Sequence, residues 1–191
     1  MIIGIDKKEL QKQREQKYNE YAILLNSSNP SSEELNALKK YLKIENVNKI
    51  YELEFFEGII GNTNCVLVEC GIGKVNAARA TQVLIDNYKL DYVFNIGVAG
   101  GVSTDLKVGD IVVGEKLVQH DFDITAFDHE KGYVPNLGGK FINANDYLID
   151  LSKKNDIPVK YGVIASGDIF CTDVNMSNKI NMKSISTEAR L

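Results

Sequence analysis

The chain has 191 residues, of which 44% are hydrophobic and 25% charged, as expected for one globular domain with its own core. The formal net charge is −4, so the bulk charge gives no reason to expect nucleic acid as a partner. No apolar run approaches the ~20 residues of a membrane span, and the first 20 residues lack the apolar core of a secretory signal, so we expect a cytoplasmic protein without a membrane partner.

The first 30 residues form an atypical polar segment. Residues 6–20 are nearly all polar and are compatible with a solvated helix at most. A short apolar run follows at residues 22–25, and residues 26–30, NSSNP, break the chain. We therefore expect the folded domain to begin after Pro30.

A helix is predicted over residues 31–43. Ser31 and Glu34 have the spacing of a capping box, and one face is marked by Leu35, Leu38 and Leu42. We expect this helix to open an α/β domain over residues 31–183, with residues 184–191, SISTEARL, as an unpatterned tail.

From Tyr51 onward the chain alternates strand and helix patterns. This alternation predicts a three-layer αβα fold with a central mixed sheet, and no apolar strand follows residue 183, so the sheet is expected to be incomplete at the C-terminus. The predicted strands are 53–60 and 64–69, paired around the Gly61-Asn62 turn, and then 92–95, 111–113, 116–119 and 159–165, and the predicted helices are 75–88 and 146–154.

Two glycine-rich turns follow predicted strands. The first, CGIGK at residues 70–74, opens a helix, and it is either a tight strand-to-helix connection or a helix N-terminus offered to a ligand. It lacks the third glycine of GxGxxG and the GK[ST] of a P-loop. The second, Gly97–Gly101, places three glycines within five residues at the end of an apolar strand. Such density lets backbone approach a small ligand at the carboxyl end of a strand, although a structural turn has the same composition.

Two further groups have both a structural and a functional interpretation. After a predicted strand comes SGDIFC, in which Asp168 could cap a helix and Phe170 could belong to the core. Alternatively, the Phe170 ring stacks on a flat heterocyclic ligand, and backbone groups beside Phe170 form hydrogen bonds with the edge of the ligand ring. Glu34 is either the capping-box glutamate or a general base held at a helix start.

The cysteines and histidines predict no metal or disulfide chemistry. Cys65, Cys70 and Cys171 are odd in number and form no CxxC pair, so they are predicted to be reduced, partly buried thiols. His120 and His129 are too few and too isolated for a zinc site. We expect neither a metal nor a cofactor.

Six motifs occur in order: LEFFEG, GIGKVNAARAT, NIGVAGG, LKVGDIVVG, QHDFDITAF and SGDIF. Over about residues 33–182 the chain thereby resembles the nucleoside phosphorylase superfamily, and within it the 5′-methylthioadenosine/S-adenosylhomocysteine nucleosidases. The resemblance implies a hydrolase that cleaves the N-glycosidic bond of these adenosine derivatives and releases adenine. It also implies a homodimer, because in this family a neighbouring subunit lines the pocket for the 5′-substituent.

The resemblance assigns roles to individual residues. Glu34 falls at the place of the family's water-activating glutamate. The resemblance implies that the two glycine turns contact the substrate, with Ile72 in the first turn and with Val98, Ala99 and Gly100 of the second under the ribose. It implies that Phe170 stacks on the adenine and that the backbone of Cys171 bonds the edge of the ring. It also implies that Ile124, Phe127 and Pro135 are contributed to the pocket by a neighbouring subunit.

Two alternatives stay open. The family's ribose-binding Met-Glu pair and its catalytic Asp have no counterpart in this chain, which we expect to be truncated before the last strands. A non-catalytic fragment or pseudoenzyme that only binds nucleosides is therefore the first alternative. The second is a phosphorolytic relative, which needs an anion pocket; near the glycine turns the sequence offers only Lys74 and Arg79.

Overall fold

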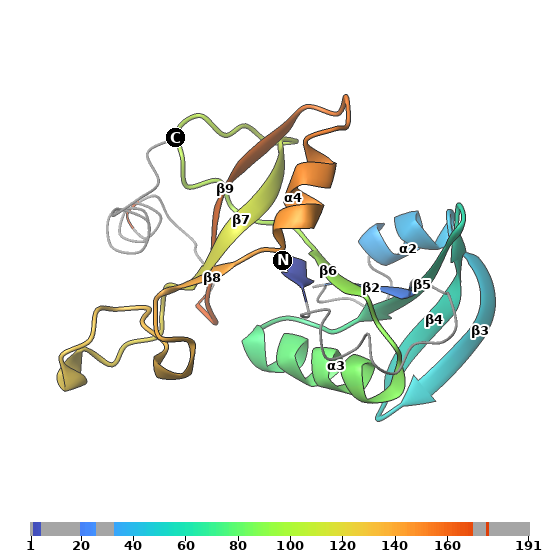
Figure 1. Ribbon diagram of the computed structural model, residues 1–191, viewed down its shortest axis with the longest axis horizontal. Helices are drawn as coiled ribbons and strands as arrows, with labels where there is room; N and C mark the ends of the chain where they lie inside the picture. The colour runs from blue at the N-terminus through green and yellow to red at the C-terminus, as the bar shows by residue number, and fades with distance from the viewer. Residues whose placement is uncertain (1, 5–19, 26–32, 170–174, 176–191) are drawn as a thin grey trace. The chain divides into compact units, whose positions relative to one another are not determined.

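The computed structural model describes residues 2–4, 20–25, 33–169 and 175, and the statements below concern these residues. The chain divides into two compact units, one spanning Ile2–Val98 and the other beginning at Ala99 (Figure 1). Among the described helices, none combines the length and the apolar character that crossing a membrane requires.

The first unit is built on a six-stranded mixed sheet in the order β1-β6-β2-β5-β4-β3. At its centre β2 runs parallel to both β5 and β6, whereas β3, β4 and β5 form an antiparallel meander. The strands are β1 (Ile2–Gly4), β2 (Glu20–Leu25), β3 (Lys43–Ile50), β4 (Leu53–Ile60), β5 (Thr63–Glu69) and β6 (Tyr92–Ile96).

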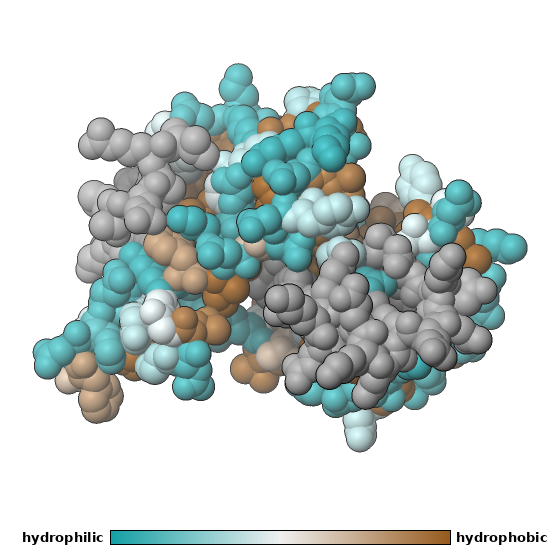
Figure 2. All heavy atoms as spheres, viewed as in Figure 1, coloured by the Kyte–Doolittle hydropathy of each residue, from teal (hydrophilic) through white to brown (hydrophobic). Residues whose placement is uncertain are grey.

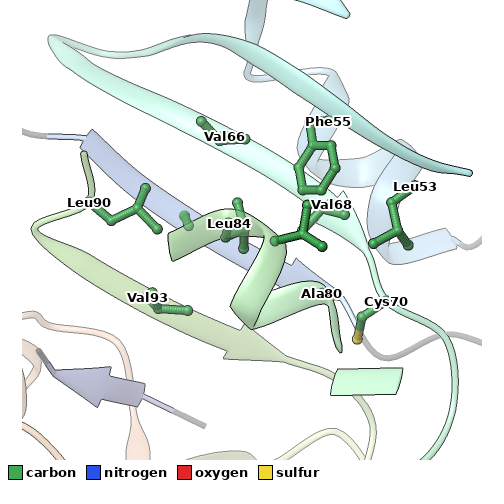
Figure 3. Close-up of a cluster of buried hydrophobic side chains, with 11 residues drawn as sticks. Leu53, Phe55, Val66, Val68, Cys70, Ala80, Leu84, Leu90 and Val93 are labelled. Carbon is green, nitrogen blue, oxygen red and sulfur yellow. The ribbon is translucent and has the colours of Figure 1, made fainter. Parts of the chain in front are cut away.

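Helices cover both faces of this sheet, because apolar residues alternate between the faces along each strand. On one face, α3 (Lys74–Asn87) packs its buried Leu84 with Phe55 of β4 and with the valines of β5 (Figure 3). On the other face, α2 (Glu33–Lys39) contributes Leu35 to a second cluster with Phe56 and Leu67. The neighbours Phe55 and Phe56 thus point to opposite layers, which gives the unit its αβα arrangement.

The predicted helix over residues 31–43 is shorter in the structure, which describes it only from residue 33. It ends at Lys39, and the chain turns where the amides of Tyr41 and Leu42 donate to the Leu38 carbonyl. Lys43 then begins β3, an edge strand that the sequence did not indicate, because its apolar residues Ile44, Val47 and Ile50 do not alternate with the polar ones and almost all of its residues are exposed. The Leu35 and Leu42 side chains are both buried as predicted, but Leu42 reaches the core from the connection rather than from the helix.

The second unit holds a three-stranded sheet in the order β8-β7-β9. The predicted strands 111–113 and 116–119 are one continuous strand, β7 (Ile111–Gln119), whose register shifts between Gly114 and Lys116. It pairs in parallel with β9 (Val159–Ser166) and antiparallel with β8 (Phe141–Asn143). The helix α4 (Asp146–Ser152) lies between β8 and β9 in the chain and is capped by Asn145, whose side chain accepts from the Leu148 amide.

The predicted α/β class with mixed sheets is confirmed, although the described strands lie in two sheets. The hairpin of β4 and β5, the helix after GIGK, and the strands after residues 91 and 158 all occur within about a residue of the expected bounds. The proposed solvated helix at 6–20 and the tail at 184–191 fall on residues outside the described ranges, so both stay predictions. The expected domain boundaries at residues 30 and 183 also stay predictions.

Candidate functional site

Three parallel strands of the first unit end side by side. In the registers of β2 with its neighbours, Leu25 lies opposite Glu69 of β5 and opposite Ile96 of β6. The segments that leave these strands therefore start from one edge of the sheet. They are the connection that leads to α2, the glycine turn at residues 70–74 and the glycine turn at residues 97–101. In open α/β sheets ligands bind at this carboxyl edge.

The first glycine turn is a tight connection between β5 and α3. Gly71 has φ 85° and Gly73, the N-cap of α3, has φ 92°, and both values favour glycine. No side chain caps the helix, and Asn76 donates to the Ile72 carbonyl at 2.7 Å. The Ile72 side chain is exposed. The turn therefore offers backbone amides and one apolar side chain at the sheet edge.

Cys70 begins this turn as a buried thiol. Its Sγ lies 3.5 Å from the Gly71 carbonyl, and burial raises its pKa. Burial likewise raises the pKa of Cys65. Because a thiol must ionise to act as a nucleophile, neither side chain is suited to covalent catalysis at neutral pH. Cys65 and Cys70 are free and buried, and Cys171 lies outside the described residues, so the reduced state of the three thiols stays a prediction.

The second glycine turn leaves β6 as exposed chain without regular secondary structure. Val98 is 88% exposed and is the last residue of the first unit, and Ala99 begins the second unit. A Cβ built on Gly100 meets no heavy atom within 4 Å, and its φ lies outside the left-handed range. Among the described residues, neither packing nor backbone conformation thus requires a glycine at position 100.

Glu34 is the second residue of α2 in the first unit and is half-buried. Ser31, its predicted capping-box partner, lies outside the described residues. The helix follows β2, whose end lies between the two glycine turns in the strand order. Glu34 thus lies on the helix that follows the central strand of this edge, and the residues that join this strand to the helix lie outside the described ranges.

In the second unit, the end of β9 is held against the end of β7. The His120 amide donates to the Ser166 carbonyl at 3.0 Å, and the Asp168 amide donates to Asp121 Oδ2 at 2.7 Å. A Cβ built on Gly167 would lie 2.2 Å from His120 Nε2, so the imidazole occupies the space that a side chain would need. These contacts fix the backbone that leads to Phe170 and Cys171, which themselves lie outside the described residues.

Sequence reasoning missed Asp121 as the residue that holds this strand end, and it considered His120 only as a zinc ligand. The signal was present as two adjacent polar residues after a strand. Their partner, however, lies 47 residues away in the sequence. Within the described ranges, no three His, Cys, Asp or Glu side chains gather closely enough to hold a metal ion.

The segment between β7 and β8 forms a folded loop. Its first short helix is η2 (Thr125–Phe127), where Asp123 Oδ1 accepts from the amide and hydroxyl of Thr125 at 3.1 and 2.8 Å. Its second is η3 (Pro135–Leu137), and the two halves are joined by a 2.7 Å hydrogen bond from the Gly132 amide to the Phe122 carbonyl.

Three predicted site residues lie on this folded loop. The Phe127 ring is 75% exposed, Pro135 is exposed, and Ile124 is half-buried. Figure 2 shows apolar surface at the outer end of the loop. A folded loop that presents an aromatic ring to solvent offers a contact to another molecule.

The predicted residues are therefore divided between the two units. Glu34, Ile72 and Val98 belong to the first unit, where topology brings their segments to one sheet edge. In the second unit lie Ala99 and Gly100 at its start and Ile124, Phe127 and Pro135 on the folded loop.

Comparison with known proteins gives one consistent result. A model of the phosphorylase superfamily matches residues 20–186. The 5′-methylthioadenosine/S-adenosylhomocysteine nucleosidase of Geobacillus sp. (strain WCH70) is 38% identical over 146 residues, which is 74% of this chain. The chain spans 62% of the length of that relative.

Solved structures agree with the sequence matches. The Neisseria meningitidis nucleosidase of the same name, in complex with methylthio-immucillin-A, has a TM-score of 0.80 at 30% identity, with 86% of this chain and 71% of that chain covered. A futalosine hydrolase mutant of Helicobacter pylori strain 26695 has a TM-score of 0.78 at 29% identity, with 86% and 75% covered.

Proposed function

Because the chain belongs to the phosphorylase superfamily, as a relative of the 5′-methylthioadenosine/S-adenosylhomocysteine nucleosidases, we propose that it hydrolyses the N-glycosidic bond of these adenosine derivatives and releases adenine. The observation that carries the proposal is the shared edge of β5, β2 and β6. Both glycine turns and the connection to Glu34 leave the sheet there in register.

The proposed chemistry uses the Glu34 carboxylate as the general base. It takes a proton from water while the water oxygen attacks the anomeric carbon of the sugar. The bond from that carbon to the purine nitrogen breaks and its electron pair goes to the purine. A proton from solvent water adds to a purine ring nitrogen, so adenine leaves neutral, and Glu34 afterwards returns its proton to solvent. The sugar passes through an oxocarbenium-like state, as in other glycoside hydrolyses.

The sugar is proposed to lie against Val98, Ala99 and Gly100. The empty space around the Cβ position of Gly100 supports this role, because a sugar can approach backbone there without displacing protein atoms. Ile72 is also proposed to contact the substrate, and the exposure of its side chain on the first glycine turn supports this role. Phe170 and the backbone of Cys171 are proposed to hold the adenine, beyond the strand end that His120 and Asp121 fix.

A homodimer is part of the proposal. Ile124, Phe127 and Pro135 are proposed to line the pocket for the 5′-substituent of a neighbouring subunit. The exposure of the Phe127 ring on a folded loop supports this role, since a partner surface would bury it.

Hydrolysis is favoured over phosphorolysis by the basic residues near the glycine turns. Phosphorolysis needs a site for the phosphate anion. Arg79 Nη2 donates to the Tyr51 carbonyl at 3.5 Å, so part of the donor capacity of this guanidinium is used by the protein's own backbone.

The test is chromatographic detection of adenine released from 5′-methylthioadenosine, with and without phosphate. Glu34→Gln keeps the side-chain size and removes the base, and we expect its rate to fall about 10²- to 10⁴-fold. Glu45→Gln, on the exposed strand β3 of the same unit, is the matched control and keeps the wild-type rate.

Three results would contradict the proposal. Phosphate-dependent turnover that yields a sugar 1-phosphate would show that the chain catalyses phosphorolysis rather than hydrolysis. Binding of the nucleoside measured by calorimetry, without any release of adenine, would show that the chain binds nucleosides but does not cleave them. Equal rates for Glu34→Gln and the control would remove Glu34 from its role as the base.

A further inference from the structure

The segment between the second glycine turn and β7 is folded into two consecutive turns. In the first, the Leu106 amide donates to the Ser103 carbonyl at 3.2 Å. In the second, the Asp110 amide donates to the Lys107 carbonyl at 3.1 Å, and Gly109 between them has φ 92°. Residues 102–110, which we call the connecting segment, thus have a defined backbone without being a helix or strand.

One ammonium group joins the two turns. Lys160, on β9, donates through Nζ to the Asp105 carbonyl in the first turn and to Asp110 Oδ2 in the second, the latter at 2.8 Å. The same Asp110 oxygen accepts from the Lys107 amide at 2.7 Å. A lysine ammonium carries three donors, so one side chain can bond both turns at once.

The hydrogen bonds to Asp110 favour the charged form of its carboxyl group. The hydrogen bond from Lys160, followed by that from the Lys107 amide, lowers the pKa of Asp110. The carboxylate is therefore charged over the whole neutral range, and the bonds to it do not depend on pH there.

The connecting segment is packed directly against the glycine turn. A Cβ built on Gly101 would lie 3.1 Å from Leu106 Cβ, so the Leu106 side chain rests on the backbone of Gly101. Leu106 lies between Asp105 and Lys107, which are both bonded to the Lys160–Asp110 pair. Physical contact therefore runs from Lys160 through Leu106 to the last residue of the glycine turn, all within the second unit.

We propose that Lys160 is a positioning residue, which holds the connecting segment and, through Leu106, fixes the glycine turn in the conformation that takes the sugar of the nucleoside. The part of this proposal that concerns the sugar rests on the proposed function. Lys160 touches no reacting atom, so its removal changes how well substrate is held and leaves the chemical step unaltered.

Lys160→Met tests the proposal, since it keeps a long side chain and removes the donors. Hydrogen–deuterium exchange of the connecting segment, measured without ligand, should become about 3- to 10-fold faster, because the amides lose the bonds that hold both turns closed. KM for 5′-methylthioadenosine should rise about 3- to 10-fold with kcat unchanged, as expected for a coupling residue outside the site.

Two variants serve as controls. Lys154→Met removes an exposed lysine whose side chain makes none of the hydrogen bonds or ion pairs found among the described residues, and it should change neither quantity. Lys160→Arg retains the charge and the donors, and it should restore exchange to within about twofold of the wild type.

The exchange measurement separates this proposal from the proposed function. Unchanged exchange in Lys160→Met overturns the positioning role, whatever the activity. Faster exchange with an unchanged KM overturns the link to the sugar. A wild-type chain that neither binds nor cleaves nucleosides refutes the proposed function and with it the sugar contact, while exchange still decides whether Lys160 holds the connecting segment.

Discussion

Substituting Gly167 by alanine is the sharpest perturbation of the strand end that leads toward Phe170. The added Cβ would lie 2.2, 2.7 and 2.9 Å from three ring atoms of His120. Ordinary contact begins near 3.4 Å, so the imidazole or the strand must move by about 1.2 Å at Nε2. The three atoms belong to the far end of the His120 side chain, so relief requires the imidazole to leave its rotamer or the strand to shift.

We expect Gly167→Ala to lower the free energy of unfolding by about 1–3 kcal/mol, the usual cost of overpacking. Urea unfolding monitored by circular dichroism measures this difference. Gly139→Ala is the matched control, because a Cβ there meets no heavy atom within 4 Å and the φ lies outside the left-handed range. The control should lie within about 0.5 kcal/mol of the wild type.

A double-mutant cycle assigns the cause. His120→Ala removes the ring, so adding Gly167→Ala to that variant should cost about 1 kcal/mol less than adding it to the wild type. Equal costs in the two backgrounds would show that the clash with His120 is not what excludes a side chain at position 167. A Gly167→Ala protein as stable as the Gly139→Ala control would refute the packing argument altogether.

Two further predictions concern the first unit. Leu84→Ala in α3 should lower the free energy of unfolding by about 2–5 kcal/mol in urea titrations, because Leu84 is fully buried between the helix and the sheet. Ile85→Ala, at the neighbouring exposed position, should lower it by less than about 1 kcal/mol. Equal effects of the two substitutions would contradict the assigned helix face. Burial holds the pKa of Cys70 and Cys65 above the usual value of 9.0, so the unfolded chain releases these protons first. The contribution of the two thiols to stability should therefore be constant below about pH 9 and fall as the pH rises further. Urea midpoints of a variant with both cysteines replaced by alanine should lose that decline, and a decline that persists would show that other groups cause it.

Local patterns predicted the elements that carry strong local signals. The hairpin of β4 and β5 combines alternating apolar residues with a Gly61-Asn62 turn, and Gly61 indeed has φ 62°. The helix α3 follows two glycines and repeats apolar residues at helical spacing. In both cases neighbours in the sequence decide the structure, so no distant contact was needed for the prediction.

Elements that depend on distant partners were not predictable in this way. The residues of β3 show no strand-type alternation of apolar and polar residues, because the strand is an exposed edge held by hydrogen bonds to β4 rather than by a buried face. The run at residues 22–25 gave no sign that it lies between β5 and β6, since four apolar residues do not specify their partners. The Lys160–Asp110 pair joins residues 50 positions apart, and nothing near either residue marks the other.

The candidate site shows the same limit. Each glycine turn was recognisable from its own residues, but their meeting at one sheet edge follows only from the strand order. The roles of Phe170, Cys171 and the loop residues came from the resemblance to a family, and they stay predictions.

A crystal structure of the chain with a non-hydrolysable 5′-methylthioadenosine analogue tests the central claim most directly. The account predicts the sugar in van der Waals contact with Gly100, the base against Phe170 and a carboxylate oxygen of Glu34 within hydrogen-bonding reach of the water beside the anomeric carbon. An analogue bound elsewhere, with Gly100 and Glu34 both facing solvent, would contradict it.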